Sequence, residues 1–282
     1  MILKSPLNYT GSKKKLLDRI LPVFPKDIDN FVDLFAGGLN VGINVNANTI
    51  YVNDRITYII ELYELFRSTN TDDLLQEIYS FIKEYQLDQN SSEGYYRLRN
   101  DFNATKKPIL LFILGCYCFS FQIRFNNSME FNMPYGKEKH KFNASIEKNL
   151  LYFVNALQTK NFVFSSLDFR EFDYDQLKPG DVVYCDPPYL ISTAAYNDGN
   201  RGFGDWKQKD DQDLLNTLDM LNDKGIKFVL SNVFIHRDQI NYSLIEWSKK
   251  YNVIYMDRDY TNAQYNLKNR KAKTVEVLIT NY

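Results

Sequence analysis

Residues that bind metals or form disulfides are scarce in this sequence. Its 282 residues include two histidines, His140 and His236, and three cysteines, Cys116, Cys118 and Cys185. Structural zinc sites need closely spaced groups of Cys and His, and no such group is present, so no metal site is expected. An odd number of cysteines without paired spacing favours buried thiols in a reducing compartment.

Long apolar runs are also lacking. The apolar segment Ile109–Phe121 is too short to cross a bilayer core of about 30 Å, and therefore predicts a buried helix. The first residues carry no apolar run of the signal-peptide kind. We therefore expect a cytoplasmic protein that does not bind membranes.

Neither sign of charge is in excess, since the formal net charge is −1. This excludes a protein coated in positive charge but not DNA binding, which depends on where the charge lies. Clusters of basic residues are usually solvated surface, and alternatively they contact phosphates. Three clusters occur: Lys4, Lys13, Lys14, Lys15 and Arg19; Lys137, Lys139 and Lys141; and Lys268, Arg270, Lys271 and Lys273.

Strand and helix patterns alternate at both ends of the chain. Apolar runs predict strands at Phe31–Phe35 and Thr49–Asp54, followed by a helix over Ile56–Phe66. The alternation resumes with a strand at Asn161–Ser165 and closes with one at Thr274–Thr280. This arrangement predicts a doubly wound α/β sheet.

The middle of the chain does not alternate in this way. Residues 71–121 predict three helices, with Pro108 in the first turn of the third. Arg124–Gly136 then has the pattern of a β-hairpin. This block is therefore interpreted as an insertion, and the Gly-, Asn- and Asp-rich segment Ser192–Trp206 as a mobile loop.

The tetrapeptide Asp186-Pro187-Pro188-Tyr189 directly follows a predicted strand at Asp181–Cys185. A plain turn would explain one proline, but each residue also suits chemistry on an aromatic amine. The Asp186 carboxylate and the Pro187 carbonyl can accept the two N–H groups, and the prolines Pro187 and Pro188 fix the backbone beforehand. Tyr189 offers a face on which a base stacks, worth about 1–3 kcal/mol.

Three other segments are consistent with a nucleotide-like cofactor. Phe31–Gly38 has a strand followed by a Gly-Gly turn, which by itself often marks only a turn. Asp54 ends the next strand, where it either accepts from ribose hydroxyls or caps the helix that follows. Near the N-terminus, Tyr9 and Lys13 are interpreted as lining the cofactor pocket, with Lys13 reaching a carboxylate of the cofactor.

The order of these segments resembles the Dam family of DNA adenine N6-methyltransferases, especially its T-even phage members. Shared patterns are the YTG-x-K opening at Tyr9–Lys13, FVDLF-x-GG at Phe31–Gly38, the acid at Asp54 and DPPY at Asp186–Tyr189. Further similar stretches are Phe164–Phe169, Leu221–Val233 and Glu246–Val253.

The resemblance implies a Rossmann-like seven-stranded mixed sheet, as in class I methyltransferases, with an inserted helical target-recognition domain that ends in a β-hairpin. Residues 1–56 and 160–282 are then the catalytic domain, and 57–159 the recognition domain. The resemblance also implies S-adenosylmethionine as cofactor. Its expected contacts are Tyr9, Lys13, Phe35, Gly37, Asp54, Asp168 and Asp186.

In the family, the hairpin enters the major groove of duplex DNA and reads GATC. The matching DNA-binding positions here are Phe119, Gln122, Arg124, Asn126, Pro134 and Lys137. Arg124 suits a bidentate contact to guanine, and Phe119 occupies the position of an aromatic wedge. Gln122 departs from the apolar residue usual at its position, and Glu138 stands where some phage relatives carry a basic residue.

The predicted function is site-specific methylation of a flipped-out adenine in duplex DNA, with GATC as the expected site and no obligatory protein partner. Two alternatives remain: a methyltransferase acting on another planar amino group, in RNA or a protein glutamine, and an inactive DNA-binding scaffold. Whether the protein acts alone or protects DNA within a restriction-modification system is left open.

Overall fold

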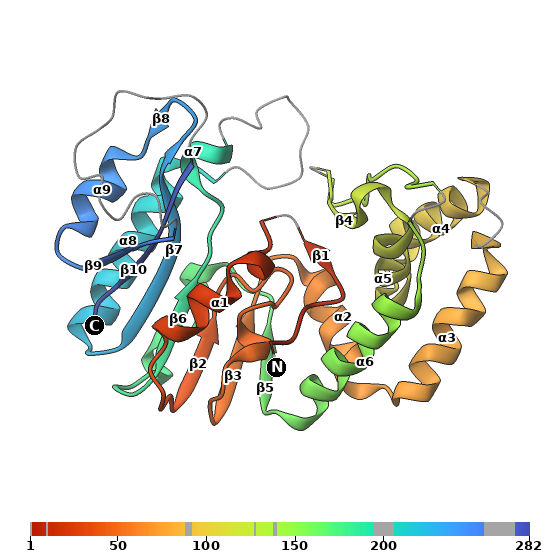
Figure 1. Cartoon of the computed structure of the whole chain (residues 1–282), viewed down its shortest axis with the longest axis horizontal. Coiled ribbons are helices and arrows are strands. Elements are labelled where there is room, and N and C mark those ends of the chain that lie inside the picture. The colour runs from red at the N-terminus through yellow and green to blue at the C-terminus, as the bar shows by residue number, and fades with distance from the viewer. Residues whose placement is uncertain are drawn as a thin grey trace.

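The computed structural model describes residues 2–9, 11–87, 92–126, 128–137, 140–193, 206–256 and 274–282. Within them, a sheet runs in the order β5-β3-β2-β6-β7-β10-β9, and a short strand, β8, pairs with β7 (Figure 1). The strands are β2 (Asn30–Asp33), β3 (Thr49–Asn53), β5 (Phe162–Ser165), β6 (Val182–Cys185), β7 (Lys227–His236), β8 (Gln239–Ile240), β9 (Asn252–Tyr255) and β10 (Thr274–Thr280).

The five strands from β5 to β7 are parallel, and β10 runs antiparallel to both of its neighbours. This confirms the predicted mixed α/β fold with a mainly parallel sheet. The seven strands from β5 to β9 in this order correspond to the predicted seven-stranded sheet. The additional strand β8 was not predicted. The strand β7 continues to His236, where it pairs with β8.

Alternating apolar side chains bury both faces of the sheet. Phe31 packs into one hydrophobic cluster with α1 (Leu17–Ile20), whereas Val32 packs into a second cluster with α8 (Gln208–Asp223) and α9 (Tyr242–Ser248). Successive strand residues point to opposite faces, so helices on both sides are needed to cover this sheet.

A block of helices follows β3 and lies beside the sheet (Figure 1). Asn70 and Asn143 accept hydrogen bonds from backbone N–H groups at the starts of two of these helices, as N-caps do. Pro108 stands at the start of a third helix, as predicted. The helices are α2 (Thr57–Ser68), α3 (Thr71–Glu84), α4 (Ser92–Thr105), α5 (Pro108–Tyr117) and α6 (Ala144–Thr159).

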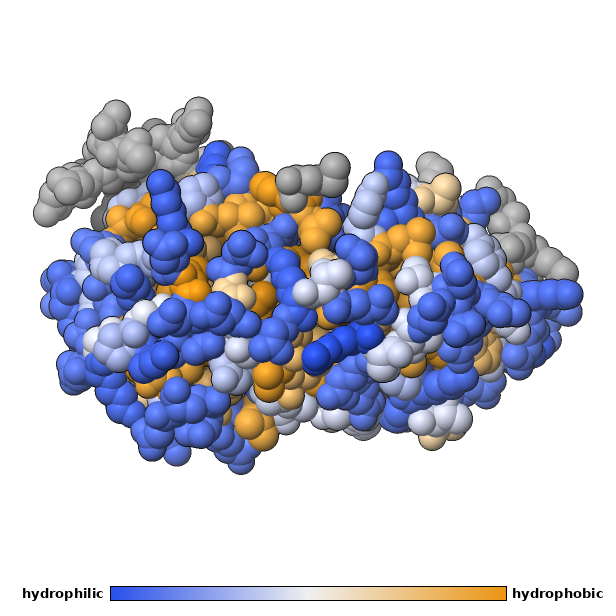
Figure 2. Space-filling view, turned by 90° about the horizontal axis from the view of Figure 1, so that it is seen from below, coloured by the Kyte–Doolittle hydropathy of each residue, from blue (hydrophilic) through white to orange (hydrophobic). Residues whose placement is uncertain are grey.

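Helix α6 was not predicted. The predicted buried helix is present as α5, but it ends at Tyr117, before the predicted end at Phe121, because the backbone turns into the left-handed region at Ser120 and Phe121. No helix in the described ranges is long and apolar enough to cross a membrane. The outer surface mixes hydrophilic and hydrophobic side chains on the face that Figure 2 shows.

The helical block shares its core with the sheet. One hydrophobic cluster includes Phe31 of β2 and Phe112 of α5. Within it, the rings of Phe66 and Phe112 meet edge to face, with centroids 5.5 Å apart. The division at residues 57–159 therefore stays a prediction, because no break in the packing marks it.

The segment after α5 has antiparallel pairing of the kind expected for a hairpin. Isolated bridges join Cys118 to Tyr135 and Phe125 to Phe131. In addition, β4 (Gln122–Ile123) pairs in parallel with β1 (Asn8–Tyr9), which was not predicted. The N-terminal motif is thereby attached to the end of the helical block.

Some predicted features lie outside the described residues. They are Asn127 within the hairpin, Glu138, Lys139, the third basic cluster, and residues 194–205 of the predicted mobile loop.

Candidate active site

The candidate site lies at the topological switch point of the sheet, where connections from neighbouring strands run in opposite directions. The strand β2 has β3 on one side and β6 on the other. The residue after β2, Leu34, still pairs with β6, since its N–H donates to the Tyr184 carbonyl at 3.0 Å. Ligands of open α/β sheets bind at such switch points, outside the carboxyl ends of the strands.

A single buried ammonium group joins two carboxylates there. Lys13 Nζ lies 3.0 Å from Asp186 Oδ1 and 3.1 Å from Glu276 Oε1. The Tyr189 hydroxyl donates to Asp186 Oδ1 at 2.9 Å and lies 3.1 Å from Ser231 Oγ. Lys13 also donates to the Tyr189 hydroxyl, and Nζ lies 4.7 Å from the centroid of the Tyr189 ring.

Charge and burial act in opposite directions in this group. Burial raises the pKa of Asp186 and the Lys13 ammonium lowers it, and the net shift is upward. Burial lowers the pKa of Lys13, but Asp186, Tyr184 and Glu276 raise it, and the net shift is upward. Lys13 is therefore a cation at neutral pH, held inside the protein by Asp186 and Glu276. Its contact with a carboxylate of the cofactor stays a prediction.

Sequence reasoning missed Glu276 and Ser231. Glu276 lies on β10, outside any recognised motif. Ser231 lies on β7 inside the similar stretch Leu221–Val233, where nothing singled it out. The one local signal for Glu276 was an acid inside the otherwise apolar run TVEVLIT. A lone acid in a buried strand usually has a partner, but the sequence does not identify that partner.

The turn after β2 is closed by groups that were predicted to bind the cofactor. Gly37 has a φ of +46°, and a Cβ there would lie 3.0 Å from a ring carbon of Tyr9. Its N–H donates to Asp54 Oδ2 at 2.8 Å, and Ile56 N–H donates to Asp54 Oδ1 at 2.9 Å. Asp54 thus orders the turn after β2 and the residues just before α2. The capping alternative is wrong, because Ile56 stands at the N-cap of α2 and no side chain caps the helix. A carboxylate has further lone pairs, so the ribose contact stays a prediction.

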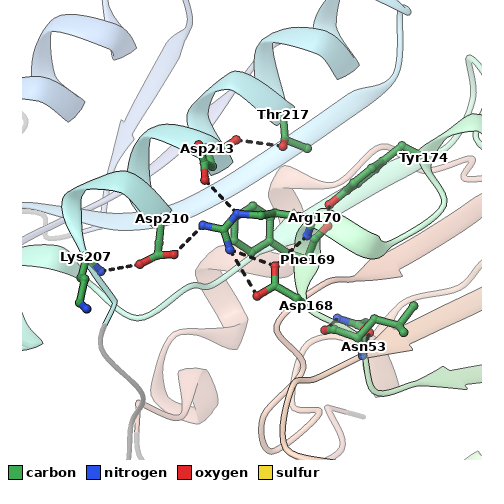
Figure 3. A network of polar contacts seen from close by, with 10 residues as sticks. Asn53, Asp168, Phe169, Arg170, Tyr174, Lys207, Asp210, Asp213 and Thr217 are labelled. Carbon is green, nitrogen blue, oxygen red and sulfur yellow. Dashed lines mark hydrogen bonds and ion pairs between the residues drawn. The ribbon is translucent and has the colours of Figure 1, made fainter.

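Asp168 lies after β5 and contacts an arginine that was not predicted. The Arg170 guanidinium lies 3.0 Å from Asp168, 2.5 Å from Asp210 and 2.9 Å from Asp213 (Figure 3). The last two residues belong to the first turns of α8. Arg170 therefore attaches the loop that carries Asp168 to the helix covering that side of the sheet.

An aromatic group adjoins this ion-pair network. The ring centroid of Phe35 lies 5.7 Å from that of Phe169 and 5.7 Å from that of Trp206. The Arg170 guanidinium lies over Phe169, 4.5 Å from the ring centroid. Phe35 follows β2 and is half-buried, and Phe169 follows β5, so this aromatic group lies at the ends of these two strands.

The predicted DNA-binding residues gather on the segment after α5. Phe119 is 55% exposed, and the exposed residues Gln122, Pro134 and Lys137 belong to the same segment. The backbone is in the left-handed region at both Ser120 and Phe121. This combination presents the Phe119 ring to solvent on a constrained turn.

Arg124 and Asn126 make hydrogen bonds within that segment. Arg124 Nε donates to Asn132 Oδ1 at 3.1 Å. Asn126 Oδ1 accepts from the N–H groups of Ser128 and Glu130 at 3.0 and 2.9 Å. Both side chains therefore help to shape the turn, whether or not they also contact DNA.

A further buried acid predicts a pH dependence of stability. Asp33, on β2, is 1% exposed and accepts a hydrogen bond from Gly42 N–H at 2.9 Å. Burial, with smaller contributions from Asp186 and Asp54, raises the pKa of Asp33 to about 7. The unfolded chain has its value near 4, so between these values only the folded state holds the proton.

The free energy of unfolding should consequently fall as pH rises from about 4 to about 7, by roughly 4 kcal/mol in total. In Asp33→Asn, which keeps an acceptor for Gly42, the part of this slope that belongs to Asp33 should be lost and stability above pH 7 should rise. A smaller slope should remain, because burial also raises the pKa of Asp54, Asp186 and Asp211. Urea unfolding across this pH range checks both. An unchanged slope in Asp33→Asn would mean that other groups titrate.

Comparison with known proteins identifies the family. A family model described as D12 class N6 adenine-specific DNA methyltransferase matches residues 9–262. The chain is 48% identical over 280 residues to the Type II methyltransferase M.FokI of Planomicrobium okeanokoites, and 45% identical over 282 residues to the modification methylase StsI of Streptococcus sanguinis. Each alignment covers 99% of this chain and 43% of the relative.

The chain therefore spans less than half the length of these two relatives. It is also 30% identical over 196 residues to a DNA adenine methylase of Serratia marcescens, covering 68% of each protein. These matches confirm the resemblance carried by the four motifs, and S-adenosylmethionine is the methyl donor used by such a family. The chain belongs to the family of D12 class N6 adenine-specific DNA methyltransferases.

Proposed function

We propose that this chain transfers a methyl group from S-adenosylmethionine to the N6 amino nitrogen of adenine in duplex DNA. One observation carries the proposal: in a chain of this family, the Asp186–Tyr189 segment leaves β6 at the switch point of the sheet and meets Lys13 there. The relatives are longer, so the activity is proposed for this chain on its own residues.

The residues at the carboxyl ends of β2, β3 and β5 fit a nucleoside-bearing cofactor. Asp54 and Asp168 are half-buried carboxylates, the type of acceptor that hydroxyl and amino groups require. Phe35 offers a half-buried ring, and Gly37 brings bare backbone beside Tyr9. When bound, S-adenosylmethionine supplies an electrophilic methyl group on a sulfonium.

The chain's own part in the reaction is to hold the amine. The lone pair of an adenine amino group is delocalised into the ring, which makes the nitrogen a poor nucleophile. Lys13 and Tyr189 both contact Asp186 through Oδ1. We therefore assign Oδ2 of Asp186 and the Pro187 carbonyl to the two N–H groups of the substrate. Two fixed acceptors favour a pyramidal nitrogen, and a strong base is not needed once that nitrogen is cationic.

The target amino group is paired inside the duplex, so the base must be extruded before it reaches Asp186.

We assign DNA recognition to residues 57–159, with the exposed Phe119 and the segment that follows it as the groove-facing part. Residues 1–56 and 160–282 form the catalytic part in this assignment. GATC stays the proposed site, supported by the positions of Arg124 and Asn126. The two relatives at 48% and 45% identity are named as a Type II methyltransferase and a modification methylase, and the DNA adenine methylase is 30% identical.

Incubation with methyl-labelled S-adenosylmethionine tests the substrate class. Duplex DNA, structured RNA and a mixture of proteins are offered separately, and label is counted in each polymer. We expect label in duplex DNA. Label in RNA or protein would support another planar amine as substrate, whereas DNA binding without any label would support an inactive scaffold.

Arg124→Ala should relax sequence choice. A bidentate arginine–guanine contact is worth about 1–3 kcal/mol of discrimination. The ratio of kcat/KM between the best site and single-base variants should therefore fall by roughly 5-fold to 150-fold. Lys137→Ala is the matched control, because loss of a phosphate contact weakens all sites about equally. If Arg124→Ala left the ratio unchanged, this segment would not be the reader.

A further inference from the structure

Two carboxylates compete for one ammonium at the active site. The side chain of Lys13 is 8% exposed, that of Asp186 17% and that of Glu276 25%. Lys13 lies at almost equal distances from the two acids. One positive and two negative formal charges therefore lie close together with little water between them. Each carboxylate weakens the ion pair that Lys13 forms with the other carboxylate.

The backbone fixes Glu276 in this arrangement. Along the β10–β7 pair, Val275 is opposite Ile235 and Glu276 is opposite Val233, so the register skips Phe234. Such bulges re-aim side chains and are common beside active sites. On the other edge, the Glu276 carbonyl accepts from Met256 N–H at 2.9 Å. The position of Glu276 is thus set from both neighbouring strands.

We propose that Glu276 is a positioning residue for methyl transfer. Glu276 shares the Lys13 ammonium with Asp186, so that Asp186 remains a strong acceptor for the substrate amine. The inference rests on the proposed function. If Asp186 were the only acid paired with Lys13, the full positive charge at Oδ1 would draw electron density through the carboxylate from Oδ2, the oxygen assigned to the substrate amine. In agreement with this role, the negative charge of Glu276 adds to burial in raising the pKa of Asp186.

The argument predicts the effect of removing one charge without changing shape. In Glu276→Gln, Lys13 pairs with Asp186 alone, so kcat at saturating DNA and cofactor should fall, on the order of tenfold. The dissociation constant for S-adenosylmethionine should change far less. Glu276→Asp, which keeps the charge, should recover part of kcat. Glu246→Gln, which removes an acid from the exposed pair with Lys249, should leave kcat unchanged.

A measurement on the cofactor-free protein separates this role from a merely structural one. Carbon-13 NMR of labelled aspartate follows the titration of Asp186, whose signal is assigned with Asp186→Asn. The pKa of Asp186 should be lower in Glu276→Gln than in the wild type. A wild-type kcat and an unchanged Asp186 titration in Glu276→Gln would overturn the inference, even if adenine methylation is established. Absence of methylation by the wild-type protein would instead overturn the proposed function.

Discussion

Asp186→Asn is expected to reduce the rate of adenine methylation by about three orders of magnitude, the upper range for loss of one preorganised electrostatic contact. The amide of asparagine has one acceptor oxygen and no charge, so it cannot serve Lys13, Tyr189 and the substrate amine together. The cofactor dissociation constant should change much less than kcat, because Asp54, Asp168 and Phe35 are unaltered.

Turnover is measured with labelled cofactor under saturating conditions, and folding is checked by thermal unfolding. Asp175→Asn is a matched control, since it makes the same chemical change at a carboxylate that is 90% exposed and pairs with Lys224. Turnover of Asp186→Asn close to that of the control would remove Asp186 from the chemistry.

Lys13→Met should produce the largest loss of stability. The substitution leaves Asp186 and Glu276 facing each other without their cation, and breaking a buried ion pair from one side costs about 3–5 kcal/mol. This loss applies where both acids are ionised, near pH 8. Without Lys13, the pKa of Asp186 in the folded state rises further above its ordinary value near 4.

The sign of the pH dependence follows from that rise. A folded-state pKa above the unfolded value means that the folded protein binds the proton more tightly. The deficit of Lys13→Met should therefore shrink as pH falls through the raised pKa of Asp186 toward 4. Urea unfolding at several pH values tests this, with Lys249→Met as an exposed control. A deficit that is constant with pH would point to lost packing instead of lost charge.

Local sequence patterns predicted most strands and helices, because these elements depend on residues that are near each other in the sequence. The strand Thr274–Thr280 and the proline at the start of α5 are where the sequence placed them. Helix α6 was missed, although Asn143 followed by an apolar-periodic run was a usable start signal. The pairing of β1 with β4 joins segments more than 100 residues apart, and no local pattern encodes it.

The same distinction holds for the site. The tetrapeptide was recognisable by itself, because its chemistry depends on adjacent residues. Lys13 and Tyr189 are 176 positions apart, and only the strand order brings them together. Glu276 and Arg170 were missed for this reason, since their roles depend on partners from other elements.

The central claim is tested most directly by identifying the methylated nucleoside. Duplex DNA is treated with the purified protein and isotope-labelled S-adenosylmethionine, then digested and analysed by mass spectrometry, with Asp186→Asn as the blank. The account predicts labelled N6-methyladenine with the wild-type protein and almost none with the variant. Label on a cytosine nucleoside, or equal label from both proteins, would contradict it.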